Sequence, residues 1–290
     1  MKKIITLIAA CLVLPVMAQD IDFEEVSAPS QQEQLLVYEN PQIPVYIGEI
    51  TYQPHSKGEK TKGVITGLLN NEISIEDEGM VEGAKEALAT SLRYVNRFVV
   101  KTGEVSAEDM GNCLVFSAKI IFCNFTEKLK EHIIDKEARI VAYITLTDPK
   151  TNRVTFSTQI SSVAWLSVFN TLAQCRDWTQ NNLMYDAANA MRRAYPLRGH
   201  MLEKGFEKGK KQKLKEIYID LGSDNRILLE SQVDVYSVKR VAGRVARHYI
   251  GSAKVVEVQG TDISLCKVTK NADEIKKAFD RGAEIAVQVY

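Results

Sequence analysis

Apolar and polar residues alternate in three consecutive segments near the middle of the chain. The alternation covers 114–122, 138–146 and 154–160, and each segment has one mostly apolar face and one mixed face. A period of two predicts strands in a sheet that is covered on one side only. Residues 148–152 (DPKTN) are typical turn residues between the last two segments. The pattern therefore predicts an antiparallel meander.

Helical spacing of apolar residues precedes and follows this meander. A helix is predicted over 76–95, where Ser74 and Asp77 form a capping-box pair at its start. A second, alanine-rich helix is predicted over 180–195, and Pro196 ends it. Two further strands are predicted, at 45–52 and 98–100. Residues 41–197 are therefore expected to form an α+β domain with helices on one face of an antiparallel sheet.

The last third of the chain differs from the rest in its charge and in the length of its apolar patterns. Residues 198–215 hold seven basic residues and two acidic ones together with three glycines, which indicates a basic linker. Residues 216–290 then show short strand patterns separated by glycines, with one short helix at 272–279, and predict a small β-barrel-like domain. The five strands are predicted at 216–221, 232–238, 251–259, 263–268 and 284–289.

The first eighteen residues have the three parts of a secretory signal peptide. Lys2 and Lys3 are followed by the apolar run 4–13, and Pro15 precedes the small residues that favour cleavage after Ala18. A competing interpretation is a lipobox that would lipidate Cys11. Residues 19–40 are acidic and contain no lysine or arginine, which predicts a flexible tether. We expect a protein exported to the periplasm or to the inner face of the outer membrane.

Charge and cysteine content restrict further which class of protein this chain belongs to. The whole chain has 37 basic and 37 acidic residues, and removing the signal leaves 35 against 37, a net charge of −2. This balance argues against a nucleic-acid partner. After residue 18 no apolar run is long enough for a membrane helix. Cys113 and Cys123 bracket one predicted strand, about 33 Å apart when extended, so the scattered cysteines are expected to be core residues.

Motifs for catalysis and cofactor binding are not found in the sequence. Residues 205–211 (GFEKGKK) lack the four-residue spacing and the Ser or Thr of a phosphate-binding loop. No GxSxG motif, HExxH pair or cysteine cluster occurs, and the histidines at 55, 132, 200 and 248 are isolated in sequence. We therefore expect no metal, no cofactor and no enzymatic activity.

One apolar run could serve as an interaction surface. Residues 163–172 (VAWLSVFNTL) follow the last meander strand and contain Trp165 and Phe169, and Trp178 lies shortly after them. One interpretation is an exposed element that meets a partner subunit or the membrane surface, where tryptophan is enriched. The other is a core element that packs at the edge of the sheet.

The order of elements resembles a known family. Residues 94–100 (YVNRFVV), the hairpin 144–154 (ITLTDPKTNRV) and the helix 186–194 (DAANAMRRA) resemble the periplasmic domain of the curli-secretion pore (CsgG-like) family and the related TolB N-terminal-like domains. The second half resembles the C-terminal β domain of flagellar assembly protein T. Its matching segments are 217–223 (IYIDLGS), 251–260 (GSAKVVEVQG) and 282–287 (GAEIAV).

This resemblance covers about residues 41–290 and implies an envelope accessory or adaptor protein. It implies a role in assembly or secretion through contacts with envelope proteins, including copies of itself in a homo-oligomer. The chain departs from the pore family because no pair of long alternating segments beyond the meander indicates transmembrane hairpins. An alternative is a regulatory module that docks on a cell-wall synthase and activates it.

Overall fold

The computed structural model describes residues 38–53, 72–75, 78–130, 133–166, 171–208, 213–242 and 244–290. Several expectations fall outside these ranges. They are the signal peptide with Cys11, most of the acidic tether and the cap residue Asp77.

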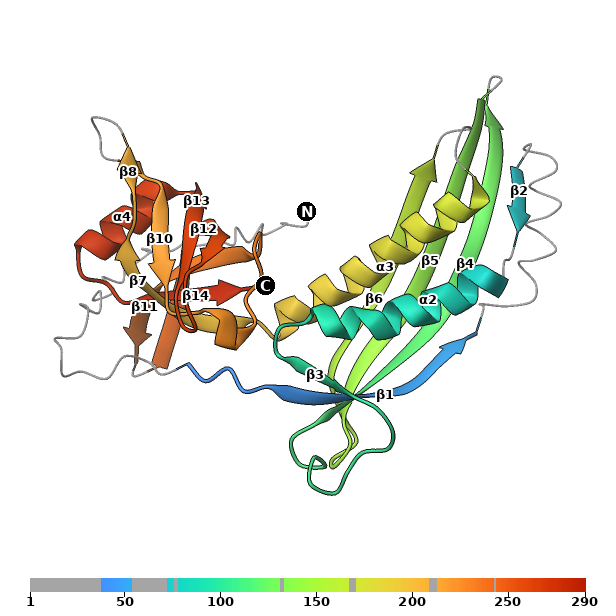
Figure 1. Cartoon of the computed structure of the whole chain (residues 1–290), viewed down its shortest axis with the longest axis horizontal. Coiled ribbons are helices and arrows are strands. Elements are labelled where there is room, and N and C mark those ends of the chain that lie inside the picture. Colours follow the sequence, from blue (N-terminus) through green and yellow to red (C-terminus); the bar gives the residue numbers. More distant parts are fainter. Residues whose placement is uncertain are drawn as a thin grey trace, which may run out of the picture.

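The first domain is built on a six-stranded sheet with the order β3-β1-β4-β5-β6, to which β2 adds by pairing with β4 (Figure 1). The meander β4-β5-β6 is antiparallel as predicted, and its strands are longer than the alternating segments. Strand β1 runs parallel to both β3 and β4, so the sheet is mixed at this side. The strands are β1 (Ile43–Tyr52), β2 (Glu72–Ile75), β3 (Phe98–Lys101), β4 (Leu114–Lys130), β5 (Ile133–Asp148) and β6 (Arg153–Leu166).

Two helices, α2 (Glu78–Ser91) and α3 (Leu172–Ala194), cover the same face of this sheet (Figure 1). A short 3-10 helix, Leu92–Tyr94, continues α2. The α+β fold class with helices on one face is therefore confirmed. Large side chains from both layers, such as Leu88, Phe116 and Ile140, are fully buried between them. Burying a side chain of this size contributes about 2 kcal/mol, so this interface holds the domain together.

Helix α3 begins eight residues earlier than the alanine-rich pattern predicts. Thr171 caps it, because the Thr171 side chain accepts a hydrogen bond from the Gln174 N–H at 3.2 Å. The Gln174 side chain in turn accepts from the Thr171 N–H at 2.9 Å. Such a reciprocal capping box satisfies two amides that the first turn would leave without partners.

The second domain is a closed six-stranded barrel with the order β10-β13-β12-β11-β14-β7. Five of its strands correspond to the five predicted ones, and α4 (Ala272–Asp280) is the predicted short helix. The barrel strands are β7 (Leu197–Lys204), β10 (Glu216–Ile219), β11 (Gln232–Val241), β12 (Arg244–Val258), β13 (Ser264–Lys270) and β14 (Ile285–Val289). The two-stranded pair β8 (Glu207–Lys208) and β9 (Lys213–Leu214) adjoins it.

The stretch 198–215, expected to be a basic linker, instead supplies the sixth barrel strand. Strand β7 pairs with β10 on one side and with β14 on the other. Leu197 and Met201 are buried in the barrel, and Gly199 passes so close to Asp220 and Leu221 that a Cβ would lie 2.9 Å from Leu221 Cγ. In the sequence, the basic residues around these few buried apolar positions make the strand pattern hard to recognise. Residues 209–212 of the stretch lie outside the described part of the chain.

Hydrogen bonds connect the two domains. The Asn96 side chain donates to the Arg226 carbonyl at 2.6 Å, and the Arg226 guanidinium donates to the Phe98 carbonyl at 2.7 Å. Near the start of the described chain, Asn40 and Arg198 exchange two hydrogen bonds of 2.7 and 2.9 Å. Since α3 also leads into β7 with only two residues between them, the domains meet over a junction and are not joined by a long linker.

All four cysteines of the described chain are buried thiols that form no disulfide, as expected of core residues. Burial raises the pKa of the Cys266 thiol to about 12. Because only the thiolate reacts, we expect native Cys266 to be alkylated by iodoacetamide at pH 8 roughly a thousandfold more slowly than after unfolding. Peptide mapping by mass spectrometry measures both rates. Equal rates in the native and unfolded protein would contradict this burial.

Candidate functional site

The face of the sheet opposite the helices is open. Its side chains alternate with the buried ones along β4, β5 and β6 and form four cross-strand rows. In order, the rows are Ser117, Thr145 and Ser157; Lys119, Tyr143 and Gln159; Phe122, Val141 and Ser161; and Asn124, Arg139 and Val163. Phe122 and Tyr143 are 40% and 41% exposed. The four rows therefore combine small hydroxyl side chains with two exposed aromatic rings and two cations, Lys119 and Arg139. Arg139 is paired with Glu137 of the next row at 3.1 Å.

Strand β6 is the edge of this sheet and carries no charged side chain from Val154 to Leu166. Within the described part of the chain it pairs only with β5. Natural edge strands usually carry a lysine, a proline or a bulge that prevents pairing with another chain. Helix α3 packs near β6, and the Asn182 side chain of this helix donates to the Val163 carbonyl at 3.2 Å. No described strand pairs with the outer edge of β6, and its register with β5 shifts between Phe156 and Val154.

Of the three aromatic residues singled out in the sequence, Trp178 has its side chain in the described part of the structure. Trp178 lies on α3 and is 54% exposed. Tyr185, two turns further along the same helix, is 48% exposed and contacts Tyr94 with ring centroids 5.8 Å apart. Trp165 is in β6, where it pairs with Glu137, but its side chain is outside the described part, and so is Phe169.

A buried cluster in the barrel was not expected from the sequence, in which its members are isolated. His200 of β7 lies between two carboxylates. Its Nδ1 is 2.8 Å from Asp220 Oδ2, and its Nε2 is 3.7 Å from Glu284 Oε1. The His200 backbone N–H donates to the other oxygen of Asp220. His200 and Glu284 are both less than a tenth exposed. Asp220 follows β10 and Glu284 precedes β14, so barrel closure alone brings the three together.

The surroundings of His200 indicate a structural role. The ring of Tyr38 covers it, with centroids 4.8 Å apart, and the Arg247 guanidinium lies 5.3 Å from the centre of the Tyr38 ring. The two carboxylates meet opposite nitrogens of the imidazole and cannot share one metal ion. The described residues contain no group of three side chains suited to a metal. The cluster lines neither of the two cavities described, of about 340 and 130 Å³. It ties the barrel strands to the segment that precedes β1.

Comparison with known proteins gives only remote likenesses. No family model matches the sequence, and no curated protein matches it significantly. Among solved structures, the PelC dodecamer from Paraburkholderia phytofirmans is 12% identical and covers 56% of this chain and 94% of its own, with a TM-score of 0.30. The hypothetical protein CT253 from Chlamydia trachomatis is 10% identical and covers 53% and 91%, with a TM-score of 0.30.

A third solved structure, a minor lipoprotein from Acinetobacter baumannii, is 12% identical, covers 52% of this chain and 89% of its own, and has a TM-score of 0.29. Likenesses at this level carry no argument about fold or function. No helix in the described ranges is both long enough and apolar enough to cross a bilayer.

Proposed function

We propose that this chain is a non-catalytic accessory protein of the cell envelope that acts in assembly or secretion through protein–protein contacts, and that it assembles with copies of itself. The observation that carries the proposal is the edge strand β6, which has no charged side chain from Val154 to Leu166 and lies next to an open sheet face. The signal peptide indicated by residues 1–18 and the resemblance to the curli-secretion pore domain support the envelope location.

A strand of this length offers a row of backbone amides and carbonyls to a partner. Pairing of an additional strand at such an edge satisfies these groups without any special side chain. Two copies that pair β6 with β6 would form a closed twofold dimer, whereas β6 against a different surface of the next copy would form a ring. The exposed ring of Tyr143 lies one strand in from this edge and that of Phe122 lies two strands in, and both add apolar area to the same contact.

Lysines placed on the edge test the proposal. In the double variant Gln159→Lys/Ser161→Lys, both new charges lie on exposed positions of β6. Because a pairing strand would have to desolvate or repel them, we expect self-association to weaken by roughly tenfold or more. Native mass spectrometry and sedimentation of the mature chain measure the oligomer and its dissociation.

The matched control is Gln259→Lys, which makes one of the same changes at an exposed position of the barrel domain and should leave the oligomer intact. Unchanged circular dichroism would show that the double variant still folds. A wild-type chain that stays monomeric at every concentration would contradict self-association. Co-purification with a cell-wall synthase from crosslinked envelopes would then favour the regulatory docking role.

A further inference from the structure

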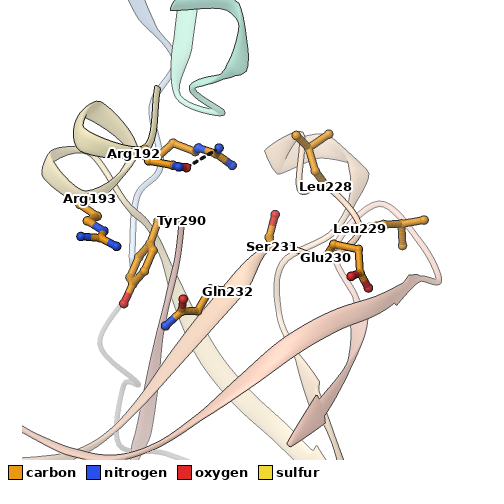
Figure 2. A pocket seen from close by; sticks show the side chains of 9 residues that line it. Arg192, Arg193, Leu228, Leu229, Glu230, Ser231, Gln232 and Tyr290 are labelled. Atoms are coloured by element: carbon orange, nitrogen blue, oxygen red, sulfur yellow. Dashed lines mark hydrogen bonds between the residues drawn. The ribbon is translucent and has the colours of Figure 1, made fainter. Parts of the chain in front are cut away.

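A cavity of about 340 Å³ lies at the junction of the two domains (Figure 2). One wall is the last turn of α3, with Asn189, Arg192 and Arg193. The other wall is the barrel segment 228–232 together with Tyr290. A volume of this size is in the range of small-molecule sites, which commonly form where domains meet. The cavity is distinct from the open sheet face and from the His200 cluster.

Arg192 presents a charge for which the described chain provides no counter-ion. One of its terminal nitrogens donates to Asn189 Oδ1 at 2.7 Å, whereas its buried Nε has no hydrogen-bond partner. Burial lowers the pKa of this guanidinium, and no carboxylate offsets the loss of water. A buried donor without a partner costs about 1–3 kcal/mol, and more when it is charged. Buried donors in proteins usually have an acceptor, so we expect the Arg192 side chain to bind an acceptor that is not part of the described chain.

Further donors surround the same space. Arg193 lies beside Arg192 and is exposed, and across the cavity are the hydroxyl of Ser231 and the side-chain amide of Gln232 (Figure 2). The one carboxylate in the lining, Glu230, is paired with Lys254 and has a side chain that is 69% exposed. The charge facing the cavity is therefore positive, and its donors come from two sides.

The cavity also has an apolar side. Leu228 and Leu229 are 47% and 59% exposed, and both line the wall that faces the arginines (Figure 2). Their segment is held between Arg226 and Glu230, two non-glycine residues with positive φ angles of 55° and 69°. Residues of this kind rarely adopt such a conformation unless the surrounding structure imposes it. Leu228 is thus held partly in solvent across the cavity from the Arg192 guanidinium, whereas the Leu229 side chain extends away from the arginines and the Arg193 guanidinium lies beside Tyr290 (Figure 2).

We propose that this junction cavity is a binding site for a phosphate monoester that carries a short apolar group. Arg192 and Arg193 bind the phosphate oxygens, Ser231 and Gln232 donate to the same group, and the leucines cover the apolar part. A phosphate is favoured over a carboxylate because its three terminal oxygens can accept from donors on both walls, and paired guanidiniums match it well. Because the ligand contacts α3 and the barrel together, its binding would also hold the two domains in one relative orientation.

Calorimetric titration of the full mature chain with butyl phosphate tests this site. We expect saturable binding that is tighter than that of inorganic phosphate by roughly fourfold for each methylene that becomes buried. Arg193→Gln, at an exposed position, should weaken binding by roughly tenfold. Arg192→Lys keeps the charge but loses the planar fork, and it should weaken binding as well. Leu228→Ser should abolish the difference between butyl phosphate and inorganic phosphate.

Arg244→Gln is the control, because Arg244 is exposed on the β11–β12 hairpin and does not line the cavity. It should bind like the wild type. No saturable binding of butyl phosphate, or equal binding by Arg193→Gln and the wild type, would overturn the proposal. Pentanoate that binds as tightly as butyl phosphate would overturn the choice of phosphate. Flotation with phosphatidic-acid vesicles that Arg193→Gln abolishes would assign the phosphate to a lipid headgroup, and butyl phosphate binding without flotation would assign it to a soluble ester.

Discussion

Replacing Gly222 by alanine is expected to destabilise the barrel domain by at least about 3 kcal/mol. A methyl group on Gly222 would lie 2.5 Å from Asp262 N and from Gly260 O, and closer still to the Thr261 carbonyl carbon. The opposing loop cannot easily retreat, because the Ser223 N–H donates to Gly260 O and the Asp224 N–H donates to Thr261 O, both at 3.0 Å. Hydrogen exchange of β10 and β13 should accelerate by roughly a hundredfold.

Gly111→Ala is the matched control for this change. The space around a Cβ at Gly111 is empty within 4 Å, and the residue does not have a positive φ angle. The control should leave the exchange rates of the barrel unchanged. Exchange rates of the first-domain strands in Gly222→Ala show whether the two domains unfold together. Wild-type exchange rates in Gly222→Ala would show that the loops do not approach each other in this way.

Replacing His200 by phenylalanine is expected to cost about 3 kcal/mol. The substitution keeps a ring for Tyr38 to cover, but it removes both imidazole nitrogens. Glu284 then stays buried without His200 Nε2, which lies 3.7 Å from Glu284 Oε1 in the native protein. Asp220 Oδ2 loses its 2.8 Å contact with His200 Nδ1. Urea-induced unfolding followed by circular dichroism measures the loss. The double variant His200→Phe/Glu284→Gln should regain part of it, because an amide is less costly to bury than a carboxylate.

The control for His200 is His248→Phe, since His248 is exposed on β12. Its replacement should change the stability by less than about 0.5 kcal/mol. If His200→Phe were as stable as this control, the contacts with Asp220 and Glu284 would contribute nothing to the fold. The outcome therefore separates a cluster that holds the barrel together from three residues that are merely close.

Most of the regular structure could be predicted from local patterns. The meander strands are predictable because a period of two is visible over five or more residues, and the five barrel strands because glycines separate short strand patterns. The start of α3 is hidden because its N-cap Thr171 stands inside the apolar run 163–172. Strand β7 was missed because its charge composition outweighed two inward apolar residues, Leu197 and Met201.

The candidate sites were much harder to predict from local sequence patterns than the strands and helices. The sequence left an exposed interaction surface and a core element both open for Trp178, and its side chain is exposed. The absence of charge from Val154 to Leu166 matters only once the strand order makes β6 an edge. His200 is 20 residues from Asp220, and Glu284 is still more distant in sequence. Arg192 and Arg193 resemble the basic residues that usually end a helix, and their exposure to a cavity depends on where the barrel lies.

The sequence by itself determined most of the strands and helices, because each of these depends on the periodicity of neighbouring side chains. Only the tertiary structure decided that β1 runs parallel to its neighbours, that the basic stretch closes a barrel, and that arginines of α3 and leucines of the barrel line one cavity. Those features depend on pairings between segments far apart in the chain, and no local pattern of hydrophobicity or charge encodes such pairings directly.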